Sequence, residues 1–217
     1  MPMLLKFCGV QTMTDYGLVV QSQADYIGFI FAPSKRKVNP EEVGDWVRRI
    51  GTNQKKLVGV FVNAEETEIA QVLHSVPLDV LQLHGNEIPT VVQKVKKRFN
   101  LSIWKALPHG PNTMPLMKKY HGFVDGFLID TKVKGAFGGT GQSFDWTHVP
   151  VYIKESHHLE VPCFIAGGIH AMNVEGLLTY APDGIDVSSG IEKNGQKDRM
   201  KIQVIERKVK RNDVYTP

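Results

Sequence analysis

The chain has 217 residues, of which 42% are hydrophobic and 22% are charged, and its formal net charge is +4 at pH 7. This length and composition are typical of a single globular domain with a sizeable core. No apolar stretch approaches the roughly 18 residues of a membrane helix, and no signal-peptide core is visible, so we expect a cytoplasmic protein that does not bind membranes. The two cysteines, Cys8 and Cys163, exclude a disulfide framework and match no metal motif.

Apolar runs rich in β-branched residues alternate with amphipathic segments along the chain. In chain order, the predicted strands are Leu4–Cys8, Tyr26–Phe31, Leu57–Val62, Val80–His84, Ser102–Ala106, Val124–Asp130, Cys163–Ala166 and Gly184–Ser188. The helical segments predicted between them include Pro40–Ile50, Glu65–Ser75, Glu87–Phe99, Asp145–Glu155 and Ala171–Tyr180. Asn39 and Pro40 form a typical helix start, because asparagine caps the first turn and proline suits its first position.

Eight strands, each followed by a helical segment, predict eight βα units. Nearly every strand is apolar on both faces, as expected of a parallel sheet that helices cover. We therefore predict an α/β fold, a single-domain (β/α)8 TIM barrel of parallel strands over residues 1–217. A doubly wound open sheet is the alternative, but it usually has fewer strands and a glycine-rich first turn. The glycine-rich turns here come late in the chain.

Three titratable side chains stand at the C-terminal ends of predicted strands, where barrels of this class carry their active sites. Cys8 shares its strand face with Lys6, whose ammonium, together with the start of the first helix, favours a reactive thiolate. The alternative for Cys8 is a small buried residue. Asp130 ends an apolar strand, which favours a raised pKa and a general acid, or else it caps a turn. His84 is equally suited to catalysis and to hydrogen-bonding a ligand.

Two late strands run into turns of small residues. The last strand is followed by Ser188-Ser189-Gly190, and the strand before it by Gly167-Gly168. Main-chain N–H groups at such turns, together with two serine hydroxyls, are suited to binding a phosphate. The two turns therefore predict an anionic substrate.

Two connections and the C-terminal stretch carry further signals. The glycine-rich connection Thr131–Phe144 follows the sixth strand and is long enough to act as a functional lid. The run Ser34–Lys37 is either a solvated loop or, beside a barrel mouth, the source of an arginine that binds a carboxylate. The basic residues between Lys197 and Arg211 fit the solvated face of a terminal helix. Because no recognition motif accompanies them, we do not expect a nucleic-acid partner.

A series of short motifs occupies the strand ends and the loops after them. In chain order they are Lys6–Val10, Gly28–Phe31, Ser34–Val38, Gly59–Asn63, Leu81–Gly85, Ile129–Asp130, Gly138–Gly141, Phe144–Trp146, Ala166–Ile169, Asp186–Glu192 and Gly195–Asp198. This series resembles the phosphoribosylanthranilate isomerase family over nearly the whole chain, and it looks closest to the standalone enzymes of bacilli. Lys35 departs from the family pattern, because many relatives carry proline before the arginine.

The resemblance implies an isomerase of tryptophan biosynthesis that needs no cofactor and no metal. Its implied reaction is the Amadori rearrangement of phosphoribosylanthranilate to 1-(2-carboxyphenylamino)-1-deoxyribulose 5-phosphate. The resemblance implies Cys8 as general base, Asp130 as general acid and Arg36 as the group that holds the anthranilate carboxylate. The implied phosphate site is formed by main-chain groups around Gly167, Gly168, Ser188, Ser189 and Gly190. The remaining implied substrate contacts are Gln82, His84, Asp186 and, in the closing loop, Gly139 and Thr140.

Two rival functions remain open. Another phosphosugar barrel, such as indole-3-glycerol-phosphate synthase or a pentose-phosphate epimerase, calls for a lysine–glutamate set or for several metal ligands at strand ends, where only His84 is available. A non-catalytic barrel that binds a phosphometabolite would keep the phosphate turns and lose the acid or the base. Cys8 and Asp130 are both present, which argues against it. A monomer is favoured over a homodimer.

Overall fold

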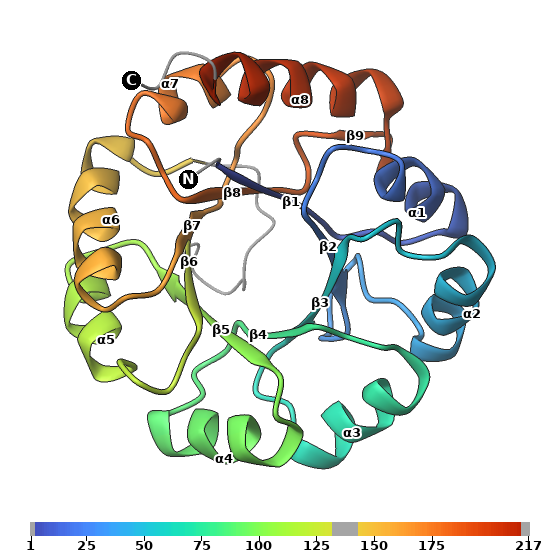
Figure 1. The fold of residues 1–217 in the computed structure, drawn as a ribbon, viewed down its shortest axis with the longest axis horizontal. Coiled ribbons are helices and arrows are strands. Elements are labelled where there is room, and N and C mark those ends of the chain that lie inside the picture. The colour runs from blue at the N-terminus through green and yellow to red at the C-terminus, as the bar shows by residue number, and fades with distance from the viewer. Residues whose placement is uncertain (1–2, 132–142, 214–217) are drawn as a thin grey trace.

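The structure is a computed structural model that describes residues 3–131 and 143–213, with side chains as far as residue 209. Its strands are β1 (Leu4–Cys8), β2 (Tyr26–Ile30), β3 (Lys56–Phe61), β4 (Val80–Leu83), β5 (Ser102–Pro108), β6 (Gly126–Asp130), β7 (Cys163–Ile165) and β8 (Gly184–Val187). They pair in parallel in chain order, and β8 returns to β1 to close a barrel. Figure 1 shows the strands at the centre and the helices around them. The predicted (β/α)8 barrel is confirmed.

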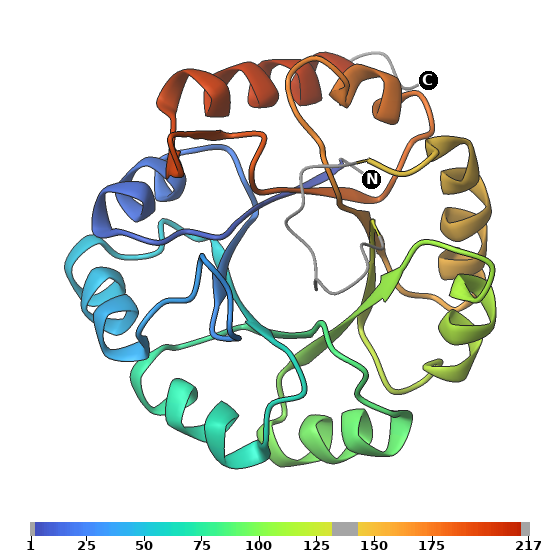
Figure 2. The ribbon, with the colours of Figure 1, turned by 180° about the vertical axis from the view of Figure 1, so that it is seen from behind.

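The helices cover the barrel from outside, as the view from behind also shows (Figure 2). They are α1 (Met13–Val20), α2 (Pro40–Ile50), α3 (Glu66–Ser75), α4 (Pro89–Phe99), α5 (Thr113–Lys119), α6 (Val149–His158), α7 (Val174–Leu178) and α8 (Arg199–Asp213). Asn39 caps α2 as predicted, because its side chain accepts the N–H groups of Glu41 and Glu42. An antiparallel hairpin of β9 (Glu192–Lys193) and β10 (Gln196–Lys197), which was not predicted, separates β8 from α8. No helix in the described ranges is long and apolar enough to cross a membrane.

The strands β2, β3, β4, β7 and β8 each end one residue earlier than predicted. The residue that follows can still hold one hydrogen bond to the neighbouring strand. The N–H of His84 donates to Phe61 at 2.7 Å, and that of Ala166 donates to Ile129 at 2.8 Å. The chain then turns toward the next loop, so these residues lie at the rim of the barrel. In contrast, β5 extends two residues beyond its prediction, to Pro108.

Four helical segments also differ from their predicted bounds. The helices α3 and α4 begin one and two residues later than predicted, and two other segments differ more. The segment predicted as Asp145–Glu155 starts with a 3-10 turn at Trp146–His148 before α6 begins. The helix predicted as Ala171–Tyr180 is reduced to α7. The cause is local, because the Asn173 side chain accepts the N–H of His170 at 2.8 Å and holds the preceding residues in a turn.

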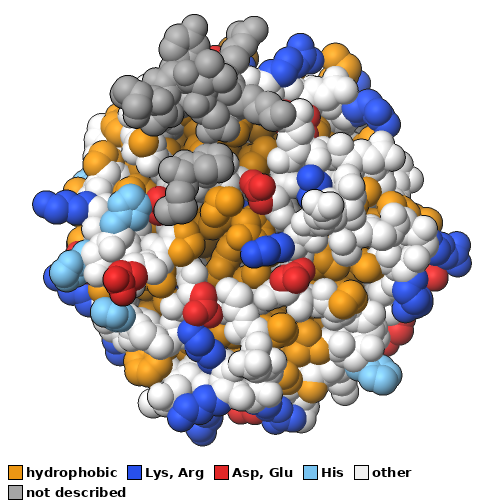
Figure 3. Space-filling model, in the orientation of Figure 1, with side chains coloured by type: hydrophobic (Ala, Val, Ile, Leu, Met, Phe, Trp, Pro, Cys, Tyr) orange, Lys and Arg blue, Asp and Glu red, His pale blue; other side chains and the backbone are white. Residues whose placement is uncertain are grey.

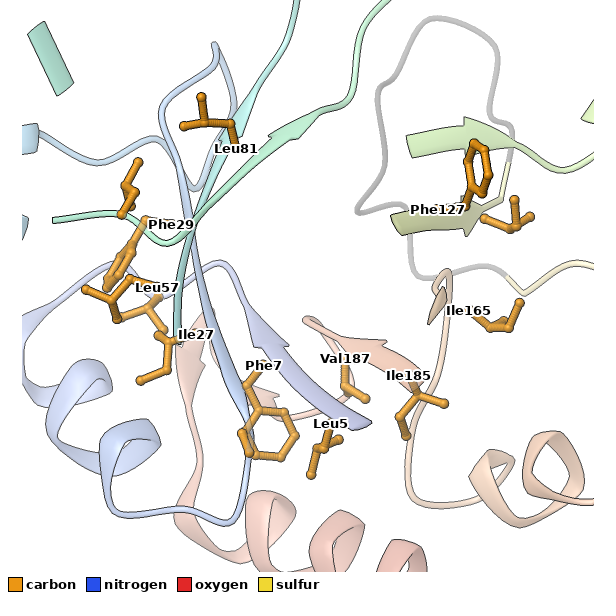
Figure 4. Packing of buried hydrophobic residues seen from close by; sticks show 14 of the residues in the cluster. Leu5, Phe7, Ile27, Phe29, Leu57, Leu81, Phe127, Ile165, Ile185 and Val187 are labelled. Atoms are coloured by element: carbon orange, nitrogen blue, oxygen red, sulfur yellow. The ribbon is translucent and has the colours of Figure 1, made fainter. Parts of the chain in front are cut away.

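Side chains alternate along each strand between the barrel interior and the surrounding helices. Those that face the helices, such as Phe7, Phe29 and Ile185, form the large apolar core between strands and helices (Figure 4). A second apolar cluster fills the interior: Val58, Val80, Trp104, Ala106, Leu128, Phe164 and Ala166. In this cluster the rings of Trp104 and Phe164 lie 4.4 Å apart. The barrel is therefore packed rather than open, and polar interior residues are left for its other end.

Four aspartates tie neighbouring strands together at the end of the barrel where the strands begin. Each precedes an even-numbered strand, and its carboxylate accepts a main-chain N–H from the strand before it. The pairs are Leu5 with Asp25 at 2.8 Å, Leu57 with Asp79 at 2.7 Å, Ile103 with Asp125 at 2.9 Å, and Cys163 with Asp183 at 2.8 Å. Figure 3 looks onto this end and shows acidic side chains around an apolar centre. This aspartate ring repeats every second strand, and it serves the stability of the fold.

Candidate active site

Alternate strand residues bring polar side chains to the rim of the barrel opposite the aspartate ring. Cys8 and Asp130 are the last residues of β1 and β6, and they are 6% and 7% exposed. His84 and Ser188 directly follow β4 and β8. The structure therefore brings to one rim the polar groups that the sequence places at strand ends.

Cys8 is a buried thiol. Gly28, its partner on β2, leaves room for it, because a Cβ there would lie 2.6 Å from the Cys8 sulfur. Burial raises the pKa of the Cys8 thiol, and the ammonium of Lys6 opposes this rise without cancelling it. The expectation of a favoured thiolate is therefore wrong for the free protein. The ammonium lies close by, but α1 begins only at Met13, and burial dominates.

Asp186 is the counter-ion of Lys6 inside the barrel. The two residues are partners in the β1–β8 register, and Lys6 Nζ lies 3.0 Å from Asp186 Oδ1. Their side chains are 0% and 9% exposed. Burial acts to lower the pKa of Lys6, but Asp186 and Cys8 outweigh it, so this pKa lies above its ordinary value. Lys6 therefore keeps its positive charge at neutral pH, close to Cys8.

Asp130, His84 and Gln82 form a chain of polar contacts between β6 and β4. His84 Nε2 lies 3.4 Å from Asp130 Oδ2, and His84 Nδ1 lies 3.0 Å from Gln82 Nε2. Because an amide nitrogen can only donate, we assign His84 Nδ1 as the acceptor and place the ring proton on Nε2, facing Asp130. The other oxygen of Asp130 accepts the N–H of Thr131 at 2.7 Å. One carboxyl group thus makes a turn contact and also faces a site histidine.

The two glycine turns after β7 and β8 lie against each other. In Gly167-Gly168 both residues have positive φ angles, 86° and 59°, which glycine adopts without strain. His170 and Gly190 form a parallel bridge, and a Cβ at Gly190 would collide with the carbonyl oxygen of Ile169. The hydroxyl of Ser188 is buried and has no hydrogen-bond partner among the described residues. Close main chain and an unpaired hydroxyl suit this part of the rim to an anion.

Arg36 is buried rather than solvated. It is 3% exposed, and its Nε and Nη2 atoms each lie 2.8 Å from a carboxylate oxygen of Glu192. The side chain passes Gly9, where a Cβ would lie 2.6 Å from Arg36 Cδ and 2.9 Å from the Ser188 hydroxyl. Arg36 therefore runs between the end of β1 and the turn after β8. Glu192 was missed as a site residue, although it closes the Asp186–Glu192 motif.

Other predicted or possible site residues lie elsewhere. Gly139 and Thr140 lie outside the described residues. Cys163 is fully buried at the start of β7, and burial raises the pKa of its thiol. The ring of His109 stacks on Phe144, with centroids 4.3 Å apart. In the described ranges, no group of three or more His, Cys, Asp and Glu side chains is arranged to hold a metal.

The rim combines three chemical capabilities. A thiol with a nearby ammonium can remove a proton once it is ionised. A buried carboxyl that faces an imidazole can donate one. The glycine turns and the guanidinium can hold two anionic groups of one ligand. Together these groups fit proton transfers within a small molecule that is anionic at both ends.

The model of the protein family described as "N-(5'phosphoribosyl)anthranilate (PRA) isomerase" matches residues 5–208 of this chain. The chain is 50% identical over 206 residues to the N-(5'-phosphoribosyl)anthranilate isomerase of Geobacillus thermodenitrificans, covering 95% of this chain and 93% of the relative. It is 47% identical to the enzyme of that name from Halalkalibacterium halodurans, covering 98% and 97%. The Bacillus subtilis enzyme of that name is 44% identical, with 95% of each chain covered.

Solved structures give the same result. Phosphoribosyl anthranilate isomerase from Thermotoga maritima superposes with a TM-score of 0.83 at 30% identity, covering 96% of this chain and 98% of that one. A structure of such an isomerase in complex with reduced 1-(o-carboxyphenylamino)-1-deoxyribulose 5-phosphate superposes with a TM-score of 0.80 at 30% identity, with the same coverage of 96% and 98%.

Proposed function

The chain belongs to the N-(5'-phosphoribosyl)anthranilate isomerase family, and from this premise we propose that it converts phosphoribosylanthranilate to 1-(2-carboxyphenylamino)-1-deoxyribulose 5-phosphate in tryptophan biosynthesis. The observation that carries the proposal is that one rim of the barrel holds both a buried thiol, at the end of β1, and a buried carboxyl, at the end of β6. The reaction is an internal redox isomerisation of an aminoaldose to an aminoketose, and it consists of proton transfers.

Asp130 is the proposed general acid. It protonates the furanose ring oxygen, and the ring opens to a Schiff base as the bond between that oxygen and C1′ breaks. His84, which faces the carboxyl at 3.4 Å, orients it toward the sugar. Each proton transfer of this kind contributes a rate factor of about 10²–10⁴.

Cys8 is the proposed general base. Its thiolate removes the proton from C2′ of the Schiff base, and the electron pair moves to the nitrogen to give an enolamine. The enolamine then tautomerises to the aminoketose product. Because the Schiff-base nitrogen accepts the electron pair, the proposed chemistry calls for neither a cofactor nor a metal. Lys6 assists because its ammonium opposes the effect of burial on the pKa of Cys8.

The two ends of the substrate bind at opposite sides of this chemistry in our proposal. Main-chain groups of the turns around Gly167-Gly168 and Ser188-Ser189-Gly190 hold the phosphate, which orients the sugar without reacting. Arg36 holds the anthranilate carboxylate. Glu192 occupies two of the five guanidinium N–H donors, so three remain for a carboxylate.

The rest of the pocket is proposed from its position at the rim. Gln82 and Asp186 contact the sugar together with His84, and the loop that holds Gly139 and Thr140 closes over the substrate. The Gln82 side-chain oxygen is buried without a hydrogen-bond partner among the described residues, which suits a sugar hydroxyl.

We extend the proposal to a single domain over residues 1–217, a cytoplasmic location and a monomer. A solved Thermotoga maritima relative is described as monomers generated from a dimeric enzyme, so the oligomeric state calls for its own measurement. Sedimentation at micromolar concentration gives one species near the mass of a single chain if the proposal holds, and twice that mass if it fails.

Growth of a tryptophan auxotroph that lacks this isomerase tests the proposal. The intact chain restores growth, whereas Cys8→Ser and Asp130→Asn do not, because each loses a proton-transfer group. Cys163→Ser is the matched control, since it makes the same chemical change at a cysteine away from the rim, and it restores growth. A chain that restores no growth although it is folded and expressed overturns the proposed activity.

A further inference from the structure

Arg36 belongs to a buried cluster of three charged side chains. Glu192 accepts hydrogen bonds from Arg36 Nε and Nη2, each at 2.8 Å, and from Lys197 Nζ at 2.9 Å. The exposed fractions of the side chains are 4% for Arg36, 9% for Glu192 and 0% for Lys197. The three groups come from the β2–α2 loop and from both strands of the β9–β10 hairpin. Their charges sum to +1, which one substrate carboxylate would neutralise.

Lys197 connects this cluster to the main chain of the site. Its Nζ atom donates to the carbonyl oxygen of Cys8 at 2.6 Å and to that of Ser188 at 3.3 Å, in addition to Glu192. An ammonium has three donors, so all three are used. Its main-chain N–H also donates to Asp15 at 2.9 Å. The ammonium therefore joins the end of β1, which carries the thiol, to the turn after β8.

Glu192 is ionised in this setting. Burial acts to raise the pKa of Glu192, but the hydrogen bonds and charges of Arg36 and Lys197 outweigh it and bring the pKa below its ordinary value. Burial lowers the pKa of Lys197, and the charge of Glu192 opposes this. Removing the carboxylate charge would leave two cations buried side by side.

The orientation of the guanidinium follows from the contacts of Glu192. A guanidinium is planar and rigid, so two hydrogen bonds along its Nε–Nη2 edge also fix the direction of its end edge, which is formed by Nη1 and Nη2. The stem has little room to swing, because a Cβ at Gly9 would already lie 2.6 Å from Arg36 Cδ. The contacts of Glu192 therefore determine which edge of the Arg36 guanidinium stays available and in which direction it points.

We propose that Glu192 is a positioning residue that orients the available edge of Arg36 toward the substrate's aromatic carboxylate. Through Lys197, Glu192 also fixes the position of this edge relative to the main chain of Cys8. This inference rests on the proposed function of the site, because it presumes that Arg36 receives that carboxylate. It assigns recognition of the carboxylate to a cluster of three residues rather than to one arginine.

The test measures binding of two ligands to the intact chain and to its Glu192→Gln variant. One is the reduced product analogue with its aromatic carboxylate, and the other is the same analogue with a plain phenyl ring. The amide keeps the size of the side chain, but it replaces one acceptor oxygen with a donor that faces cations. The variant binds the carboxylate analogue about 10- to 100-fold more weakly, as expected for a charge-assisted contact, whereas its affinity for the phenyl analogue changes less than about twofold.

Two further variants complete the design. Glu175→Gln changes a glutamate whose side chain is 63% exposed and pairs with Lys208 at 2.6 Å, so it should leave both affinities unchanged. Glu192→Asp keeps the charge and shortens the reach by one methylene. It therefore keeps the fold stable and weakens binding of the carboxylate analogue alone, which preserves the test if Glu192→Gln does not fold.

The outcomes separate the two proposals. Equal weakening of both ligands in the Glu192 variants means that the residue only supports the fold, and no weakening of the carboxylate analogue means that Arg36 needs no alignment. Either result overturns the inference. If the intact chain does not prefer the carboxylate analogue, or if Arg36→Ala keeps that preference, Arg36 does not bind the carboxylate, and the proposed role of Arg36 is wrong.

Discussion

Loss of the Asp186 carboxylate should destabilise the whole barrel, because it leaves Lys6 as an uncompensated buried charge. The Lys6 side chain is 0% exposed, and its Nζ atom lies 3.0 Å from Asp186 Oδ1. Removing one partner of such a pair costs about 3–5 kcal/mol, a large share of the roughly 5–15 kcal/mol that stabilises a typical domain. Asp186→Asn should therefore lower the urea midpoint at pH 7 by about 1–2 M.

The pH dependence of this deficit identifies its cause. In the intact chain the pKa of Lys6 lies above its ordinary value of 10.5, so the stabilising contribution of Lys6 persists to alkaline pH. Without Asp186 the main counter-ion is gone, and burial lowers the pKa of Lys6 below that of the unfolded chain. Stability then rises as the pH increases between these two values, because the unfolded state binds more protons. The deficit of Asp186→Asn should shrink from pH 7 toward pH 10.

A double-mutant cycle completes the test. Lys6→Met alone leaves a buried carboxylate without its cation and should cost a comparable free energy of unfolding. The double variant should cost less than the sum of the single variants by about 2 kcal/mol, because no buried charge is left unpaired. Additive costs, or single costs below about 1 kcal/mol, would mean that Lys6 and Asp186 do not neutralise each other inside the barrel.

Three further predictions follow from other contacts. Asp79→Ala removes the acceptor of the Leu57 N–H at 2.7 Å, so a thermal melt should show that the free energy of unfolding falls by about 0.5–1.5 kcal/mol, with no change in KM. A clear rise in KM would contradict a purely structural role of Asp79. Gly190→Ala brings a Cβ against a main-chain oxygen, so both the melting temperature should fall and KM should rise, whereas Gly176→Ala, whose Cβ has nothing within 4 Å, should do neither. Because burial raises the pKa of Cys8 above 9.0, kcat/KM should still increase between pH 7 and pH 9, and a profile that is flat over this range argues against Cys8 as the base.

The fold was predictable because the signals that specify it are local. Runs that are apolar on both faces, such as Cys163–Ile165, indicate buried parallel strands, and their regular alternation with amphipathic segments indicates the barrel. The strand ends were less certain, because a residue such as His84 keeps one hydrogen bond to the next strand and then leaves it. The sequence shows which residue follows a strand, but it does not show after which hydrogen bond the chain leaves the sheet.

The site was predicted where a side chain stands at a strand end, and it was missed where the partner comes from a distant segment. Cys8 and Asp130 follow directly from the strands that they close. Arg36 read equally well as a solvated residue, because its partner Glu192 lies 156 positions further along the chain. Lys197 falls in a basic stretch that fits an exposed helix face, yet it is buried beneath the rim.

The pKa of Cys8 shows the same limit in energetic terms. The alternation along the first strand places Lys6 and Cys8 on one face, so the ammonium was visible in the sequence. The depth of burial depends on the surrounding strands, and it outweighs the ammonium. The sign of a pKa shift in a packed interior is decided by the balance of these two effects, of which a sequence displays only one.

The most direct test of the isomerase activity is the anthranilate-type fluorescence of phosphoribosylanthranilate mixed with a small amount of the purified chain. We predict that the fluorescence decays through many turnovers, and that Cys8→Ser and Asp130→Asn each lower kcat by about 10²–10⁴ while they still bind the reduced product analogue. Near-normal turnover in either variant would remove that residue from the mechanism. A signal that shifts on mixing and then stays constant would show a passive binder and contradict the isomerase activity.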